Sequence, residues 1–232
     1  MIKNLDINAL ERMRERFNRL YGPREVEHLI ERMVATIGRY GVGLAGFRQA
    51  KMWDETTAIL ITYGDMVQHE DEPPLAVLKR FTDRYLVGAI DTVHILPFYP
   101  YSSDDGFSVI DYRAVDPKLG RWTDVQNLGS SFRLMFDLVL NHCSRKSKWF
   151  SAYTSNIAPY RDYFITVDPE IDLSAVTRPR NLPLLTPVHT RHGDEHVWTT
   201  FSDDQIDLDF SNPDVLFDFL DILLFYIANG AT

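Results

Sequence analysis

Residues 132–142, with the sequence FRLMFDLVLNH, are a nearly continuous apolar run that is too short to span a membrane. Such a run is typical of a buried strand in a parallel sheet that is covered on both faces. It contains Asp137 and ends with Asn141 and His142. Ligands bind at the carboxyl ends of parallel strands, so these polar residues are candidates for a site. A strand that merely ends in loop-facing polar groups, or an Asp137 that only bonds backbone groups, would have the same sequence.

Strands and helices alternate before this run. Residues 58–63 and 92–96 predict strands, and a helix is expected between them after Pro73 and Pro74. Residues 122–128 predict a short helix that leads into the central run. This alternation favours a parallel sheet with right-handed crossovers.

The N-terminal part of the chain predicts two helices without obvious chemistry. Residues 7–20 and 26–37 carry apolar side chains at helical spacing, and Gly22 and Pro23 separate them. We expect a helical hairpin that docks on a larger body. Residues 43–54 are predicted to be a linker.

The alternation of predicted strands and helices stops after residue 142. Short aromatic and proline-rich pieces over residues 143–202 predict a subdomain inserted after the third strand. Within it, a hairpin is expected over residues 189–198, with its turn at 192–194.

A well-marked helix follows the insertion. Asn212, Pro213 and Asp214 predict its start, and Asn229 and Gly230 predict its end. A further strand is expected directly after Gly230. Three strands are less than half of a closed barrel, so we expect the sequence to be the N-terminal part of a longer chain.

Composition excludes several classes of protein. The chain has 232 residues and a net charge of −9, which argues against nucleic acid as a partner. The most apolar late segment carries Asp218 and Asp221, so no membrane partner is expected. The single cysteine, Cys143, excludes an internal disulfide and indicates a reducing, cytoplasmic location. It is expected to pack in the core rather than to act as a nucleophile.

Two clusters that suggest a metal site are discounted. The histidines in the expected hairpin fit no helical zinc motif, since a glycine turn interrupts them: His189, His192 and His196. The stretch QIDLDF lacks the glycine and terminal glutamate of a calcium loop. No metal and no cofactor are therefore expected.

The loop after the second predicted strand has the residue types that sugar recognition needs. Asp104 and Asp105 could accept hydrogen bonds from neighbouring sugar hydroxyls, and Phe107 could cover a ring. The alternative is a polar turn in which Gly106 adopts a left-handed conformation. Farther along, Arg180 in the sequence RPR (residues 178–180) could grip an anion or be an ordinary surface arginine.

Together, these motifs resemble the α-amylase family, glycoside hydrolase family 13. The resemblance rests on DLVLNH (residues 137–142), SSDDGFSVIDY (102–112) and QIDLDFSNP (205–213), in this order. Within the family, the second motif and the RPR sequence are most similar to the sucrose phosphorylase group. The helical hairpin and LITYGD (60–65) are similar to relatives that act on glucosylglycerate.

The resemblance implies the N-terminal part of a (β/α)8 barrel with an inserted B domain after strand three. The expected parts are an N-terminal helical extension, the first barrel strands, the B domain, and a barrel helix that leads to strand four: residues 1–52, 53–142, 143–204 and 205–232.

The resemblance also implies transfer of an α-glucosyl group with retention of configuration, through attack by one carboxylate and protonation of the leaving oxygen by another. Asp104 would bind hydroxyls of the donor glucose, with Phe107 as an apolar wall. His142 and Gln205 would line the same subsite, and Arg180 would reach phosphate. The implied partners are an α-glucoside and inorganic phosphate, and a homo-oligomer is left open.

The reacting carboxylates of the family have no counterpart here. The nucleophile lies in an R-x-D motif that is expected beyond Thr232, and the acid/base residue lies farther on. The 232 residues alone are therefore expected to be inactive. An α-glucoside hydrolase of the same family and a non-catalytic carbohydrate-binding fragment are the alternatives.

Overall fold

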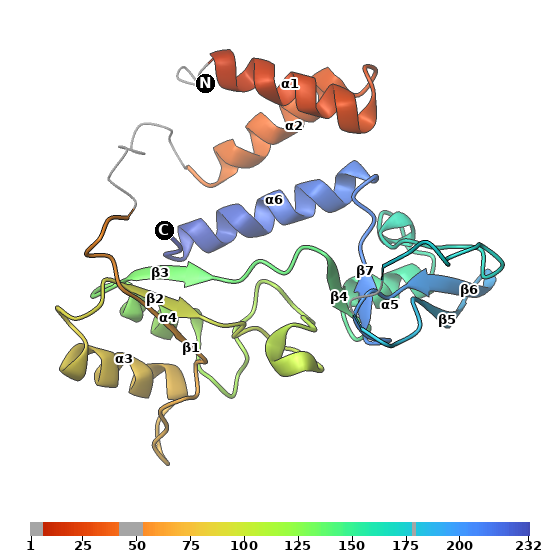
Figure 1. Cartoon of the computed structure of the whole chain (residues 1–232). Coiled ribbons are helices and arrows are strands. Elements are labelled where there is room, and N and C mark those ends of the chain that lie inside the picture. Colours follow the sequence, from red (N-terminus) through yellow and green to blue (C-terminus); the bar gives the residue numbers. More distant parts are fainter. Residues whose placement is uncertain (1–6, 42–52, 178–179) are drawn as a thin grey trace.

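A parallel three-stranded sheet, in the order β1-β2-β3, is the centre of the fold. The computed structural model describes residues 7–41, 53–177 and 180–232. Two crossover helices lie together on one face of the sheet (Figure 1). The elements in chain order are β1 (Ile59–Thr62), α3 (Pro74–Tyr85), β2 (Thr92–Ile95), α4 (Trp122–Leu128) and β3 (Arg133–Phe136). The predicted parallel alternation is confirmed.

Only one face of this sheet is covered by the described residues. Val93 and Leu134 point toward the helices and are 0% and 1% exposed. On the opposite face, Ile61 and Met135 are 62% and 41% exposed. The expectation of a strand buried on both faces was therefore wrong for these residues, because alternate side chains of a strand point to opposite faces.

The apolar run at residues 132–142 is not one strand. β3 ends at Phe136, and β4 (His142–Ser144) pairs antiparallel with β7 (Gln205–Asp207). Between them, side chains satisfy the backbone: the Tyr99 and Tyr112 hydroxyls donate to the carbonyls of Asp137 and Val139, both at 3.0 Å. A strand ladder is therefore not needed there to satisfy these buried carbonyls.

Helix α6 (Pro213–Ala228) runs beside β3, as Figure 1 shows. The Asn212 side chain accepts a hydrogen bond from the Asp214 amide at 2.9 Å, as predicted for its cap. The Tyr226 ring stacks on Tyr99 at 5.2 Å and joins this helix to the sheet. After the helix, Ala231 bridges to Leu134 in parallel orientation, where the next strand was expected.

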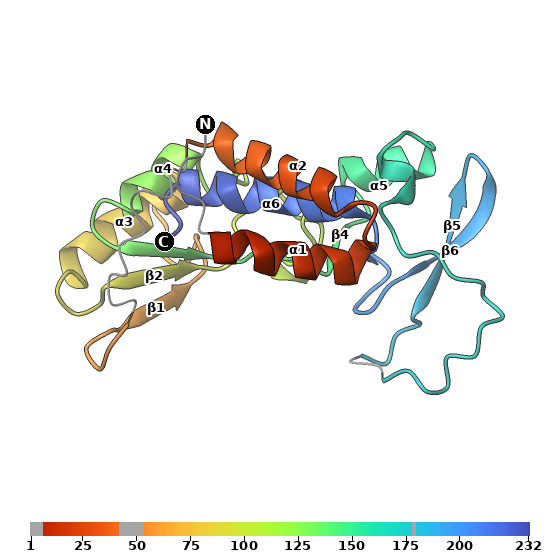
Figure 2. The same ribbon diagram turned by 90° about the horizontal axis from the view of Figure 1, so that it is seen from above.

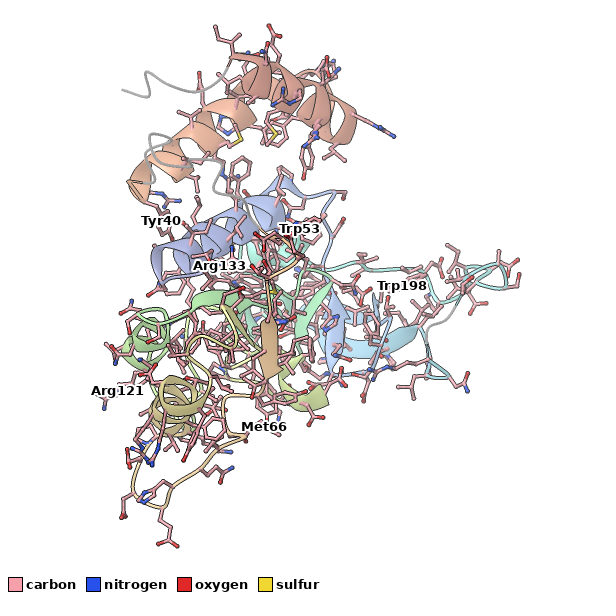
Figure 3. All side chains as sticks on the ribbon, turned by 60° about the vertical axis from the view of Figure 1, so that its left-hand side comes forward. Tyr40, Trp53, Met66, Arg121, Arg133 and Trp198 are labelled. Atoms are coloured by element: carbon pink, nitrogen blue, oxygen red, sulfur yellow. The ribbon has the colours of Figure 1, made fainter. Side chains whose placement is uncertain are left out.

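The predicted helical hairpin is confirmed as α1 (Ile7–Tyr21) and α2 (Val26–Arg39). The hairpin forms a layer over the outer side of α6 (Figures 1 and 2). Phe17 packs against Phe217 with 6.3 Å between ring centroids. Tyr40, just after α2, lies near Asp221 of α6 (Figure 3). The predicted linker lies mostly outside the described residues, as does the boundary at residue 52.

The insertion extends from one end of the molecule (Figure 2). It contains α5 (Lys148–Thr154), η2 (Tyr160–Asp162), β5 (Leu185–Thr190) and β6 (Gly193–Trp198), and the β4–β7 ladder closes its base. The hairpin turns one residue earlier than predicted, because Thr190 pairs with Gly193 and the Thr190 hydroxyl accepts from the His192 amide. No helix among the described residues is long and apolar enough to cross a membrane.

Candidate functional site

The loop after β2 makes a tight turn, η1 (Asp104–Gly106), above the carboxyl end of the sheet. Asp104, Asp105 and Gly106 have positive φ angles of 55°, 49° and 103°. A Cβ atom on Gly106 would lie 2.7 Å from the Pro97 carbonyl oxygen, so glycine is required there. Aspartate tolerates the left-handed region better than most residues, and the turn presents both carboxylates to solvent.

The four residues predicted to bind sugar come together at this turn. The Gln205 side-chain nitrogen lies 2.9 Å from Asp104 Oδ2 and 3.1 Å from His142 Nε2. His142 Nε2 lies 3.0 Å from the Phe107 carbonyl oxygen. The turn, β4 and β7 thus contribute to one cluster, although about a hundred positions separate Gln205 from Asp104 in the chain.

Hydrogen-bond partners fix the orientation of the buried Gln205 amide. The Ser202 hydroxyl donates to Gln205 Oε1 at 2.9 Å, which directs the amide nitrogen toward Asp104. Gln205 is fully buried, whereas the Asp104 side chain is 34% exposed. A rigid donor therefore holds a carboxylate whose remaining lone pairs can accept hydrogen bonds from a polyol.

His142 is 5% exposed, and its burial lowers the pKa of the imidazole, although the Phe107 carbonyl and the nearby Asp207 and Asp104 carboxylates oppose this effect. The ring is therefore neutral at neutral pH. A neutral imidazole carries one N–H donor and one acceptor, and either can form a hydrogen bond with a hydroxyl group.

Arg180 reaches into the same cluster. Its Nη2 lies 3.4 Å from both carboxylate oxygens of Asp104, and its guanidinium lies 5.7 Å from the centre of the Phe201 ring. Arg178, the other arginine of that motif, lies outside the described residues. The geometry places an arginine beside the turn, where an anion could also be held.

Phe201 is a member of the cluster that sequence reasoning missed. Its ring packs against the His142 imidazole with 5.2 Å between centroids. Its position four residues before Gln205, at the exit of the insertion, was the available signal.

Two other candidates have structural explanations. The Asp137 carboxylate lies 2.9 Å from His94 Nε2 on the uncovered face of the sheet, rather than bonding to backbone groups. Cys143 is fully buried, and burial raises the pKa of its thiol to about 12 despite the Ser147 hydroxyl. The thiol therefore stays protonated at neutral pH and is a poor nucleophile.

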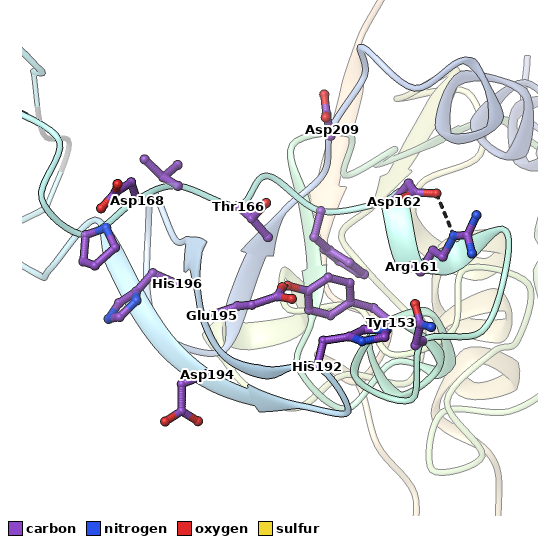
Figure 4. Close-up of a pocket in the computed structure, with 14 residues that line it drawn as sticks. Tyr153, Arg161, Asp162, Thr166, Asp168, His192, Asp194, Glu195, His196 and Asp209 are labelled. Carbon is purple, nitrogen blue, oxygen red and sulfur yellow. Dashed lines mark hydrogen bonds and ion pairs between the residues drawn. The ribbon is translucent and has the colours of Figure 1, made fainter.

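The histidines of the β5–β6 hairpin lie away from this cluster. His192 and His196 line a separate hollow of about 620 Å³ in the insertion, together with Glu195 (Figure 4). His189 pairs with Asp194 at 2.8 Å. No group of three or more potential metal ligands forms within residues 7–41, 53–177 and 180–232.

Comparison with known proteins identifies the family. The model of the alpha amylase catalytic domain matches residues 85–232, which is more than half of the chain, so this chain belongs to the alpha-amylase family. The sheet and its helices are the N-terminal part of that family's TIM barrel, which confirms the expected fold class.

Within the family, the chain is similar to particular phosphorylases. It is 48% identical over 230 residues to the glucosylglycerate phosphorylase of Spirochaeta thermophila, covering 97% of this chain and 39% of the relative. It is 53% identical over 185 residues to the glucosylglycerate phosphorylase of Escherichia coli, covering 79% of this chain and 33% of the relative. The sucrose phosphorylase of Streptococcus mutans is 34% identical over 173 residues, with 70% of this chain and 35% of the relative covered.

A solved structure agrees with these relatives. The sucrose 6F-phosphate phosphorylase from Thermoanaerobacter thermosaccharolyticum superposes with a TM-score of 0.69 at 29% identity, over 79% of this chain and 40% of that one. The chain thus spans less than half the length of the relatives it matches.

Proposed function

We propose that the whole protein transfers an α-glucosyl group from an α-glucoside to inorganic phosphate with retention of configuration. The donor would be a glucosylglycerate-like α-glucoside or sucrose, and the product would be glucose 1-phosphate. The names of the glucosylglycerate and sucrose phosphorylases to which the chain is 34% to 53% identical support this proposal.

The observation that carries the proposal is the convergence of Gln205, Asp104 and His142 within 3.1 Å contacts. Asp104 would accept hydrogen bonds from the hydroxyls of the donor glucose, and His142 would bond near its primary hydroxyl. Phe107 would form the apolar wall. The carboxylate that attacks the anomeric carbon and the carboxyl that protonates the leaving oxygen would come from residues other than these 232.

The test is to incubate the purified whole protein with glucosylglycerate or sucrose, with and without inorganic phosphate. Phosphate-dependent release of glucose 1-phosphate would support the proposal. Release of free glucose alone, independent of phosphate, would instead show that the protein is an α-glucoside hydrolase. If the protein turns over no α-glucoside, a non-catalytic carbohydrate-binding role would be the remaining alternative.

Arg180 gives a sharper test of the phosphate step. Arg180→Ala removes a cation that lies 3.4 Å from Asp104 beside the proposed glucose site. We expect the KM for phosphate to rise on the order of tenfold or more, while hydrolysis of the donor is spared. Arg191→Ala, which removes the same charge from an exposed position in the hairpin turn, is the matched control. An unaltered phosphate dependence in Arg180→Ala would show that Arg180 is only a surface residue.

The remaining partners are proposed from composition. A net charge of −9 disfavours nucleic acid, so the partners would be small molecules, namely an α-glucoside and phosphate. The single buried cysteine, Cys143, suits a cytoplasmic enzyme.

A further inference from the structure

Four serine side chains surround one carboxylate next to the proposed sugar site. Asp204 Oδ2 lies 2.5 Å from the hydroxyl oxygens of Ser102 and Ser103 and 2.9 Å from that of Ser108. The Ser144 hydroxyl lies 3.4 Å from Asp204 Oδ1 and 2.5 Å from the Ser102 hydroxyl. We call these five residues the Asp204 hub.

The hub touches every chain segment that carries a proposed sugar-binding residue. Its members are one or two positions away from those residues in the chain: Ser103 from Asp104, Ser108 from Phe107, Ser144 from His142, and Asp204 from Gln205. The hub therefore ties together the turn after β2, strand β4 and strand β7. The hydrogen bonds to the Asp204 carboxylate join residues that are 60 to 102 positions apart.

The chemistry of Asp204 suits this role. Burial alone would raise the pKa of its carboxyl group, but hydrogen bonds from the four serine hydroxyls outweigh burial and lower the pKa. Asp204 is therefore ionised at neutral pH and accepts hydrogen bonds only. Ser108 and Ser144 are fully buried, so their hydroxyls are not in contact with bulk water. The described residues provide no ion pair to Asp204, so hydroxyl dipoles alone balance its charge.

The turn that the hub holds needs such support. Asp104 and Asp105 both have left-handed backbone conformations, which are unfavourable for residues other than glycine. Three backbone hydrogen bonds close the turn. The Ser102 amide donates to the Ser108 carbonyl at 3.1 Å, the Ser108 amide to the Ser103 carbonyl at 3.3 Å, and the Phe107 amide to the Asp104 carbonyl at 3.0 Å. The Asp204 carboxylate fastens both sides of this closed turn to β7.

We propose that Asp204 is a positioning residue for the donor sugar: through the serine hydroxyls it holds the Asp104 carboxylate in register with Gln205 and His142. This inference rests on the proposed function for the identity of the sugar. It concerns a residue that would not itself touch the substrate.

The first experiment compares Asp204→Asn with Asp203→Asn in the whole protein. The first substitution keeps the shape but replaces a shared acceptor oxygen with a donor, whereas Asp203 is an exposed neighbour that undergoes the same chemical change. We expect kcat/KM for the α-glucoside to fall on the order of 100-fold in Asp204→Asn, because small displacements of binding groups are costly. Asp203→Asn should have the same kcat/KM as the unmodified protein.

The kinetic pattern separates positioning from loss of folded protein. Partial unfolding lowers kcat and leaves the KM for the donor unchanged, whereas a displaced Asp104 raises that KM as well. A normal KM for the donor in folded Asp204→Asn would overturn the proposal. If Asp204→Asn does not fold, Ser103→Ala and Ser103→Thr replace it. A rise in the KM for the donor in Ser103→Ala, with a normal KM in Ser103→Thr, which keeps the hydroxyl, would support the hub. An equal KM in the two variants would overturn it.

A structural readout keeps this inference separate from the proposed function. In a crystal structure of Asp204→Asn, the contact between Gln205 Nε2 and Asp104 Oδ2, now 2.9 Å, should be broken. An unchanged contact would overturn the hub whatever the enzyme does. Absence of activity in the unmodified protein, with this contact broken in the variant, would overturn only the proposed function.

Discussion

Asp104 combines a proposed sugar-binding role with an unfavourable backbone conformation. Its φ angle is 55° and that of its neighbour Asp105 is 49°. Asparagine tolerates this region of φ/ψ space as well as aspartate does. Aspartate-to-asparagine substitutions at these two positions therefore test the carboxylates without changing the backbone preference.

Asp104→Asn should lower kcat/KM for the α-glucoside in the whole protein on the order of 100-fold, equivalent to about 3 kcal/mol. The new amide would place a donor against the Gln205 amide and Arg180, which now face a carboxylate. Steady-state kinetics would measure the change. Asp105→Asn is the matched control, and its kcat/KM should stay near that of the unmodified protein. Similar losses of kcat/KM in both variants would refute the specific role of Asp104.

At the residue scale, recognisable motifs in the sequence were sufficient to propose several candidate residues. Asp104, His142 and Gln205 were assigned through the family resemblance, and the structure brings them together. Phe201 and Asp204 were not predicted. Their closeness to Gln205 in the sequence was the available signal, but their contacts are with distant residues, which a local pattern does not specify.

At the scale of the elements, α6 was predicted from its cap and its periodicity, but its partners were not. Three of its carboxylates face arginines from other parts of the chain. Asp214 pairs with Arg32 at 2.5 Å, and Asp218 lies 4.0 Å from Arg113. Asp221 pairs with Arg39 at 3.1 Å and with Arg113 at 2.7 Å. The Arg32 guanidinium also covers the Phe217 ring at 4.3 Å. The contacts of Arg32 and Arg39 attach the N-terminal hairpin to α6, whereas those of Arg113 attach the loop after β2 to the same helix.

Arg32→Ala should weaken the docking of the hairpin by about 1 kcal/mol, because one partly exposed ion pair and one cation–π contact are lost. Amide hydrogen exchange in α1 and α2 should become faster by several-fold, and the remaining protection should depend less on salt. Arg16→Ala, at an exposed position of α1, serves as the control. Unchanged exchange in Arg32→Ala would mean that apolar contacts such as Phe17 against Phe217 hold the hairpin alone.

The apolar run at residues 132–142 shows where element prediction failed. Composition alone indicated one long strand, yet β3 stops at Phe136 and β4 pairs with β7. The tyrosine hydroxyls that accompany the break come from the loops after β2. A strand can end in mid-run when distant side chains satisfy its backbone, and a window of sequence does not contain those side chains.

At the scale of the whole molecule, the described residues leave one face of the sheet uncovered, and this face mixes apolar side chains with the His94–Asp137 pair and Arg133. Ile59, Ile61 and Met135 are 47%, 62% and 41% exposed on it. Exposed apolar side chains on a sheet with an unpaired edge strand favour self-association.

The 232 residues prepared on their own should therefore bind a hydrophobic dye and self-associate as their concentration rises. Ile61→Thr should reduce both effects, as followed by dye fluorescence and light scattering. Met66→Thr removes a side chain of similar exposure, 68%, from a loop outside the sheet and should have little effect. A monomeric, dye-free preparation of the unmodified chain would contradict this prediction.

The sequence by itself determined helices α1 to α4 and α6, the parallel alternation and the motifs of the proposed sugar site. Periodicity, capping by Asn212 and the glycine turn are local properties that a short segment carries wherever it folds. Only the tertiary structure decided that β4 pairs with β7, that Arg32 meets α6, and that Asp204 collects serines up to 102 positions away. Those contacts depend on the path of the whole chain, because a hydrogen bond forms only between groups that the fold has already brought within about 3 Å.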